Sequence, residues 1–171
     1  MEKITNEVIL KLIQDAFQQD VLSHEEPYGL LTMEVTPSKA HEMIEWLKNH
    51  ETLSVNYLTN IAGVHYPEDA GREFAVVYQL HSWKNQFRLR LKCYLAKEDI
   101  QIATITDLFA GANWTERETF DFFGIHFIGH PDLRRILNED SMDYFPMRKE
   151  FQLEDATRED KDDRYFGRNN L

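Results

Sequence analysis

Two kinds of hydrophobic spacing follow one another along the first third of the chain. Between residues 8 and 17, apolar side chains recur at three- and four-residue intervals, which predicts an amphipathic helix. Residues 31–35 alternate apolar with polar side chains and predict a half-buried strand. The pair Thr36-Pro37 predicts the start of a second helix that ends near Asn49, because proline is favoured at the first helical position.

Three longer strands are predicted in the middle of the chain. They cover residues 53–61, 73–81 and 86–94. Only residues 82–85 separate the second strand from the third, which indicates an antiparallel hairpin. We expect a short strand and a helical turn within residues 100–109. Strands that run beside segregated helices are typical of the α+β class.

The predicted strand at residues 86–94 has two chemically different faces. Apolar and basic residues alternate along it in the run Phe87, Arg88, Leu89, Arg90, Leu91, Lys92 and Cys93. This alternation predicts one face in the core and one basic face towards solvent. We therefore expect residues 1–125 to form an α+β domain in which a mostly antiparallel sheet packs with helices.

The chain changes character after Leu137. Residues 138–171 hold ten Asp or Glu and six Lys or Arg, and their apolar residues have no sustained period. Such a segment cannot bury enough area to offset its own ordering entropy, so it is either disordered or laid along a partner. The spacing of the aromatic and apolar residues favours the second, with these side chains as anchors: Tyr144, Phe145, Met147, Phe151, Leu153, Tyr165 and Phe166. Residues 126–171 are therefore predicted to form a corner and an extended, partner-binding C-terminal tail.

Composition excludes several classes of function. The formal charge is -11, which disfavours nucleic acid and anionic membrane surfaces as partners, because both need clustered basic residues. The single cysteine, Cys93, cannot close an internal disulfide or supply the thiolates of an iron–sulfur cluster. We expect Cys93 to be a buried apolar residue. Neither a signal peptide nor an apolar run long enough to span a membrane is visible, which favours a cytoplasmic protein.

The densest group of special residues is the stretch ERETFDFFGIHFIGHPDLRRIL, which covers residues 116–137. A helix is predicted from Asn113 to about Phe123, and on it Arg117 and Asp121 form an i,i+4 pair. Trp114 and Glu118 project on the same side as that pair, and Glu116, Phe120 and Phe123 project on the opposite side. Apolar residues nearly surround this helix, so we expect it to be buried on more than one face.

Glu116 is the predicted centre of a buried ion pair. Its projected position between two phenylalanines makes desolvation costly unless a cation or several donors lie close. Gly129 permits a sharp bend and Pro131 forces the preceding residue into an extended conformation, so the chain turns back there. We therefore predict that Glu116 pairs with Arg134 or Arg135, and that Glu116→Gln destabilises the protein.

Two enzymatic interpretations of this stretch compete with a structural one. His126, His130 and Asp132 could bind zinc or iron, but such a histidine pair needs a helix, which the neighbouring glycines and Pro131 disfavour. The acids of the predicted helix could act as a general acid–base pair. Acids close to an arginine pair are more often structural. No glycine-rich nucleotide-binding motif is present.

The same stretch resembles the signature of the C-type, 30-kDa subunit of respiratory complex I. The similarity extends from Asn113 to Phe151. The residues that match and that the resemblance marks as structural and partner-binding are Glu116, Arg117, Glu118, Asp121, Gly124, Gly129, His130, Pro131, Arg134, Arg135, Arg148 and Lys149. Ile136, Leu137 and Pro146 also match, whereas Asp143, Tyr144, Phe145, Met147 and Glu150 depart mildly from the family pattern.

The resemblance implies a subunit without catalytic residues and without a cofactor or metal of its own. It implies a place in the peripheral arm of a proton-pumping NADH:quinone oxidoreductase, on the cytoplasmic side of the inner membrane, with the membrane reached only through the complex. The partners would be the quinone-pocket subunit and the adjacent iron–sulfur subunit, while FMN, iron–sulfur clusters, NADH and quinone would bind in other chains.

Three alternatives stay open at this point. The chain could be the equivalent subunit of a membrane-bound hydrogenase or of a ferredoxin-linked quinone reductase, because such assemblies contain similar subunits. It could be a freestanding metal-dependent enzyme that uses the two histidines and the aspartate named above. It could also be an acidic adaptor unconnected to respiration.

Overall fold

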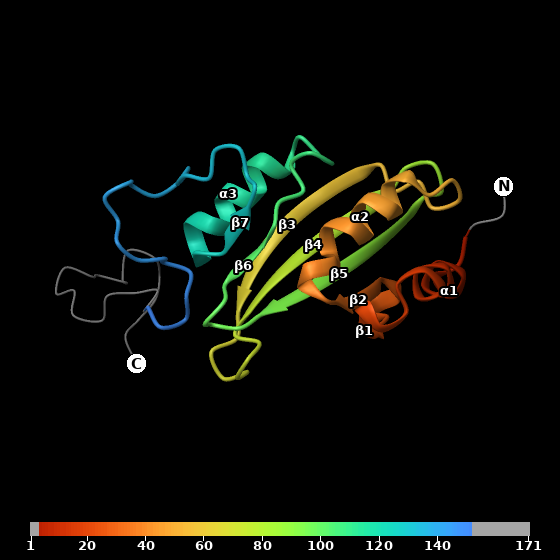
Figure 1. Cartoon of the computed structure of the whole chain (residues 1–171), viewed down its shortest axis with the longest axis horizontal. Helices are drawn as coiled ribbons and strands as arrows, with labels where there is room; N and C mark the ends of the chain where they lie inside the picture. The colour runs from red at the N-terminus through yellow and green to blue at the C-terminus, as the bar shows by residue number, and fades with distance from the viewer. Residues whose placement is uncertain (1–3, 152–171) are drawn as a thin grey trace, which may run out of the picture.

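The computed structural model describes residues 4–151, which form two layers built on a five-stranded sheet (Figure 1). All neighbouring strands are antiparallel except β2 and β5, which are parallel. The prediction of a mostly antiparallel sheet in an α+β protein is therefore confirmed. In their order across the sheet, the strands are β1 (Val21–Glu25), β2 (Leu31–Val35), β5 (Phe87–Leu95), β4 (Phe74–Ser82) and β3 (Tyr57–His65).

Helices cover one face of this sheet. Figure 1 shows α2 (Ala40–Asn49) across β4 and β5, with α1 (Asn6–Phe17) and α3 (Ala112–Phe123) to either side of it. Three short 3-10 segments, η1 (Gln18–Asp20), η2 (Pro27–Gly29) and η3 (Pro37–Lys39), connect the first elements. The core lies between the helices and the sheet, and its sheet side includes Leu31, Met33, Val76, Tyr78, Leu89 and Leu91, all no more than 1% exposed.

The opposite face of the sheet carries no helix of the described chain. Arg88 is exposed there, and Arg90 and Lys92 are half-buried, while the intervening apolar residues of β5 point into the core. The predicted division of this strand into a core face and a basic face is confirmed. Cys93 is buried on the core side, as expected, and burial raises the pKa of its thiol.

A second, two-stranded sheet brings the chain back after α3. Gly124 ends the helix in the left-handed conformation, at a φ of 74°, and the chain then enters β7 (His126–Ile128). β7 pairs in parallel with β6 (Gln101–Ala103). Residues 126–128 are thus extended, which agrees with the expectation that no helix crosses them.

Several predicted boundaries differ from the structure. The strand expected at residues 53–61 is observed at 57–65, and α3 begins at Ala112, after Gly111 rather than Asn113. β1 was not predicted, because four of its five residues are exposed and it lacks an apolar alternation. The helix expected to start at Pro37 begins with the 3-10 turn η3 and ends at Asn49 as predicted.

Gly63 allows α3 to approach β3 closely. A Cβ atom at this position would lie 2.5 Å from Cδ2 of Phe123, the last residue of the helix. We predict that Gly63→Ala lowers the free energy of unfolding by about 1–3 kcal/mol, because the packed ring cannot move aside freely. Gly111→Ala is the matched control, since its Cβ would meet no atom within 4 Å. Equal unfolding curves for both variants in urea would contradict this account.

Candidate functional site

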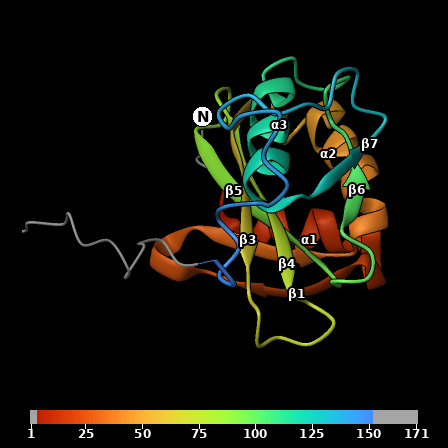
Figure 2. The ribbon, with the colours of Figure 1, turned by 90° about the vertical axis from the view of Figure 1, so that its left-hand side faces the viewer.

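The buried residues of α3 are mainly polar. Glu116, Thr119 and Asp121 are no more than 2% exposed, and Arg117 is 8% exposed. Buried charged groups are stable only when hydrogen-bonded or paired, so the three charged side chains need specific partners. The partners come largely from the C-terminal segment, which we define as residues 129–151. Figure 2 shows this segment passing along α3 towards the end of β3.

The Asp121 carboxylate accepts hydrogen bonds from the backbone of three consecutive residues. Its Oδ2 accepts hydrogen bonds from the N–H groups of Ile136, Leu137 and Asn138, at 3.1, 2.8 and 3.0 Å. Its Oδ1 accepts one from the Asn138 amide at 3.0 Å and pairs with Arg135 at 2.7 Å. Burial opposes ionisation, but these donors outweigh it and hold the pKa of Asp121 well below its usual range.

Arg135 extends the contact made by Asp121 further along the chain. Its side chain is 10% exposed, and Nη1 also donates to the backbone carbonyl of Asp121 at 3.0 Å. Nη2 donates to the carbonyls of Met142 and Tyr144, at 2.9 and 2.8 Å. The guanidinium also lies 5.0 Å from the centre of the Phe145 ring. One arginine therefore connects α3 with two later parts of the C-terminal segment.

Arg117 binds backbone rather than a carboxylate. Its Nε donates to the carbonyl of Arg134 at 3.1 Å, and its Nη2 donates to that of Arg135 at 3.2 Å. The guanidinium lies 5.3 Å from the Trp114 ring, in cation–π geometry. The predicted i,i+4 pair between Arg117 and Asp121 is wrong, because each side chain is engaged by the C-terminal segment instead.

Gly124 and Arg148 form the second attachment of the C-terminal segment. Arg148 Nε donates to the carbonyl of Phe123 at 2.7 Å, and its guanidinium lies between the rings of Phe74 and Phe145, at 4.9 and 4.7 Å. A Cβ on Gly124 would come within 2.5 Å of both Arg148 and Phe145. Glycine is required here for close approach as well as for its positive φ. Burial lowers the pKa of Arg148.

His65 completes the attachment at the end of β3, and sequence patterns did not single it out. Its ring stacks on Phe74, with centroids 4.5 Å apart, and its Nδ1 accepts a hydrogen bond from the backbone N–H of Lys149 at 3.0 Å. Burial lowers the pKa of His65, which keeps the ring nitrogen available as an acceptor. A lone histidine in a strand carries no sequence signal for such a long-range contact.

Glu116 does not form the predicted ion pair. Its Oε1 accepts from the backbone N–H of Ile105 at 2.8 Å, and its Oε2 accepts from the Thr104 hydroxyl at 2.5 Å. Burial raises the pKa of Glu116 to about 7, against the effect of these two donors. The carboxylate that holds Arg135 is Asp121, whereas Arg134 pairs with Asp132 at the surface. The corner is thus joined to α3 by a different acid than predicted.

The remaining candidate residues lie in the turn after β7. Gly129 has a φ of 84°, which confirms the predicted bend, and Pro131 is exposed. His130 Nε2 donates to the carbonyl of Asn113 at 3.2 Å, and its Nδ1 accepts from the Asp132 N–H at 3.0 Å. Both ring nitrogens are therefore engaged within the chain. Across residues 4–151, no three His, Cys, Asp or Glu side chains gather as metal ligands would.

The aromatic residues of the tail have two different roles. Phe145 packs inward, at 5.9 Å from the Phe120 ring, between the half-buried side chains of Arg135 and Arg148. Tyr144 and Phe151 contact each other at 4.9 Å, and both are partly exposed, as is Met147. The predicted anchors Leu153, Tyr165 and Phe166 lie outside the described residues. Glu118 is half-buried on α3.

Fold and site together define an α+β protein whose C-terminal corner is shaped by buried polar contacts. Comparison with known proteins agrees with this class. Residues 33–157 match the family described as the respiratory-chain NADH dehydrogenase 30 Kd subunit. The chain belongs to this family. No helix within residues 4–151 has the length and apolar content to cross a membrane.

Two curated relatives show the extent of the similarity. A C-type subunit of the NADH-quinone oxidoreductase of Rhizobium meliloti (strain 1021) is 43% identical over 127 residues, which cover 74% of this chain and 68% of that protein. A protein of Candida maltosa, described as a probable mitochondrial NADH-ubiquinone oxidoreductase 30.4 kDa subunit, is 43% identical over 121 residues. Those residues cover 71% of this chain and 43% of the relative, so the chain spans less than half of the longer protein.

Two solved structures share the fold. A trypsin-resistant fragment of Nqo5 has a TM-score of 0.62 and 31% identity, and the match covers 73% of this chain and 98% of the fragment. A chain of the membrane-bound sulfane sulfur reductase, an archaeal respiratory membrane complex, has a TM-score of 0.72 at 22% identity. That second match covers 86% of this chain and 85% of the other, and shows likeness of fold alone.

The Asp121 contact predicts a large difference between two aspartates. Asp121→Asn should lower the free energy of unfolding by about 3 kcal/mol, because it leaves Arg135 buried without a counter-charge. Asp132→Asn is the control: its ion pair with Arg134 is more than half exposed, so the loss should stay below about 1 kcal/mol. Urea unfolding at pH 7, followed by circular dichroism, measures both. Similar losses in the two variants would show that Asp121 is not a main contact.

Glu116 predicts a pH dependence of opposite sign to that of most carboxyls. Its folded-state pKa of about 7 lies above the ordinary value of 4.5, so the folded state holds the proton more tightly. The stability that this proton contributes is fully present below the ordinary pKa and is lost as pH rises to about 7, up to about 3 kcal/mol. Glu116→Gln should remove this decline and should stabilise the protein at pH 8, in contrast to the prediction made from the pattern alone.

The measurement for Glu116 is the free energy of unfolding in urea at pH 5, 6, 7 and 8. Glu118→Gln on the same helix is the control, because that side chain is only half-buried. An unchanged slope in the Glu116→Gln variant, or a loss of stability at pH 8, would contradict the prediction.

Proposed function

We propose that this chain is a structural subunit of a proton-pumping NADH:quinone oxidoreductase, in which it docks on other subunits and holds their relative positions. The observation that carries the proposal is that polar residues of the family pattern form their hydrogen bonds and ion pairs within this chain. Arg117, Asp121, Arg135 and Arg148 all bind partners within this chain. Side chains engaged in this way define a shape, which favours a role in assembly over a role in catalysis.

The surface of the same region supports a docking role. Six large apolar side chains of α3 and the segments after it are between 37 and 63% exposed: Trp114, Ile128, Leu137, Tyr144, Met147 and Phe151. Exposed apolar residues scattered singly are normal, but a concentration on one part of a protein marks an interaction site. We assign this part of the surface, the corner surface, to the contact with a partner subunit.

The partners in this proposal are the quinone-pocket subunit and the adjacent iron–sulfur subunit. In this arrangement FMN, iron–sulfur clusters, NADH and quinone bind to other chains, and this chain itself holds no cofactor and supplies no catalytic residue. It lies in the peripheral arm on the cytoplasmic side of the inner membrane and reaches the membrane only through the complex. The names of the relatives, which describe NADH-quinone oxidoreductase subunits, support membership of such a complex.

A related assembly is the alternative that a specific observation favours. The sulfane sulfur reductase chain has the same fold over 86% of this chain, so the fold occurs in more than one kind of respiratory complex. The sequence identity of 41–43% to several NADH-quinone oxidoreductase subunits favours the first proposal.

The experiment is affinity purification of the tagged full chain from detergent-solubilised membranes, with mass spectrometry of the proteins that accompany it. Flavin- and NADH-binding subunits together with the quinone-pocket subunit are the expected companions. Hydrogenase or sulfur reductase subunits would favour the alternative. A chain recovered without respiratory subunits would contradict both.

The corner surface predicts that one exposed leucine matters for assembly and another does not. Leu137→Asp places a charge where a partner would exclude water, so recovery of the partner subunit should fall about tenfold. Leu22→Asp, on the edge strand β1, is the control at similar exposure (56% against 62%). Both variants should unfold within about 0.5 kcal/mol of the parent protein, because both side chains face solvent. Equal recovery in both variants would count against the corner surface.

A further inference from the structure

One stretch of this acidic protein contains no acid at all. The chain has 30 Asp and Glu residues, but residues 74–97 hold none of them. The same stretch holds five basic residues: Lys84, Arg88, Arg90, Lys92 and Lys97. Residues 74–95 form β4, β5 and the turn between them, which we call the hairpin, so most of this charge is concentrated on one part of the sheet.

The basic residues nearest the hairpin turn have no counter-charge in the part of the chain that the structure describes. Arg88 lies opposite His81 in the antiparallel register, on the helix-free face, and both Arg88 and Lys84 are exposed. Lys92 pairs with Glu25 at 3.0 Å. Among residues 4–151, no carboxylate lies within 4.0 Å of the side-chain nitrogens of Lys84, Arg88 or Arg90. The charge at this end of the sheet is therefore available to a partner.

Three aromatic rings stand beside these charges. Tyr57 and Trp83 are 45 and 61% exposed, with ring centroids 5.6 Å apart. His81 lies 4.9 Å from Trp83 and 6.4 Å from Tyr57. Tryptophan, tyrosine and arginine are the residue types that contribute most to binding energy at protein interfaces. An exposed group of this composition is more than a solvated strand end requires.

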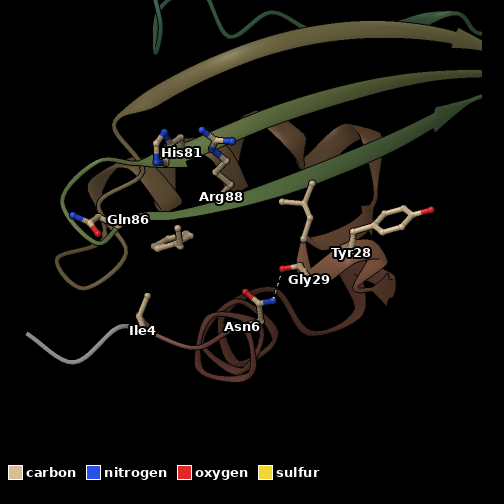
Figure 3. A pocket seen from close by; sticks show the side chains of 9 residues that line it. Ile4, Asn6, Tyr28, Gly29, His81, Gln86 and Arg88 are labelled. Atoms are coloured by element: carbon tan, nitrogen blue, oxygen red, sulfur yellow. Dashed lines mark hydrogen bonds between the residues drawn. The ribbon is translucent and has the colours of Figure 1, made fainter.

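A hollow of about 500 Å³ lies next to the same residues (Figure 3). Figure 3 shows His81 and Arg88 projecting from adjacent strands to the same side, while Ile4 and Asn6 border the hollow from the start of α1. Phe87 supplies an apolar wall. The hollow is apolar on the side of Phe87 and Ile4, whereas the side chain of Arg88 projects from β5 to the other side of the strand (Figure 3).

We infer that the end of the hairpin is a second docking surface, which takes an acidic segment of a second partner subunit. The argument is charge complementarity, because the formal charge of the protein is -11, whereas this group of basic residues has no counter-charge within residues 4–151 and would attract an acidic segment. The inference rests on the proposed function, since a subunit that holds two others in position needs two attachments. β4 runs eight residues, or about 27 Å, from Phe74, where Arg148 attaches the C-terminal segment, to Ser82 at the hairpin end, so this attachment and the hairpin end lie at opposite ends of the strand.

Crosslinking of the intact complex tests the chemistry of this surface. A carbodiimide joins a lysine amine directly to a carboxylate, and Arg88→Lys supplies an amine while keeping the charge. We expect crosslinks from Lys84, and from the lysine introduced by Arg88→Lys, to Asp or Glu of another subunit. Lys11, exposed on α1, is the control and should give none to that subunit. Crosslinks confined to this chain, its first residues included, or formed only with a second copy of it would overturn the inference.

Charge reversal tests the contribution of this surface to assembly. Arg88→Glu should lower the recovery of the second subunit about tenfold and leave the partner at the corner surface in place, whereas Leu137→Asp should have the converse effect. Lys11→Glu is the matched charge control. Thermal unfolding of each purified variant separates loss of contact from loss of fold. Full recovery of every subunit with Arg88→Glu would contradict this inference alone. A parent chain that recovers no respiratory subunit would contradict the proposed function.

Discussion

The buried carboxylate of Asp121 is the contact on which the C-terminal corner depends. Five donors surround it, three from consecutive backbone N–H groups and two from side chains. Burying such a carboxylate without partners would be costly, but here both of its oxygens accept hydrogen bonds from these donors. Arg135, which pairs with Asp121, also donates hydrogen bonds to the carbonyls of Met142 and Tyr144. The single charge of Asp121 on α3 therefore positions much of the C-terminal segment, which has no helix or strand of its own.

The rest of the fold gives this corner a rigid support. α3 is held against β3 through the close approach at Gly63, and β3 belongs to the same sheet as the β4–β5 hairpin. The second attachment, through Arg148 and His65, joins the C-terminal segment to the end of β3 and β4 that lies away from the hairpin. The sheet therefore connects the corner surface to the opposite end of the molecule, which suits a subunit that positions its neighbours.

Local patterns predicted most of the secondary structure because they report local physics. The buried face of α1 and α2 is predicted by their amphipathic spacing, and that of β5 by its alternation. The failures have equally local causes. β1 is mostly exposed, so it carries no apolar alternation, and its pairing with β2 is decided by the sheet rather than by its own residues. The region of the site was predicted correctly, but some of the contacts within it were assigned to the wrong residues.

The case of Glu116 and Asp121 shows why. Glu116 projects on the side of α3 with Phe123, where the sheet covers it, and a neighbouring loop supplies its donors. Asp121 projects on the side that looks open to solvent when the helix is considered alone. The C-terminal segment covers that side and makes it an interior. A helical projection describes one element, so it cannot show which side a later segment will bury.

The sequence by itself determined the α+β class, the two-faced strand, the lack of a second cysteine for an internal disulfide and the membership of a family through one dense stretch. Only the tertiary structure decided which acid meets which arginine, why His65 matters, and where a basic group without a counter-charge in residues 4–151 lies beside exposed aromatic rings. The physical reason is range. Hydrophobic period and turn chemistry act between residues a few positions apart, whereas the buried polar contacts depend on segments brought together from 11 to 84 positions apart.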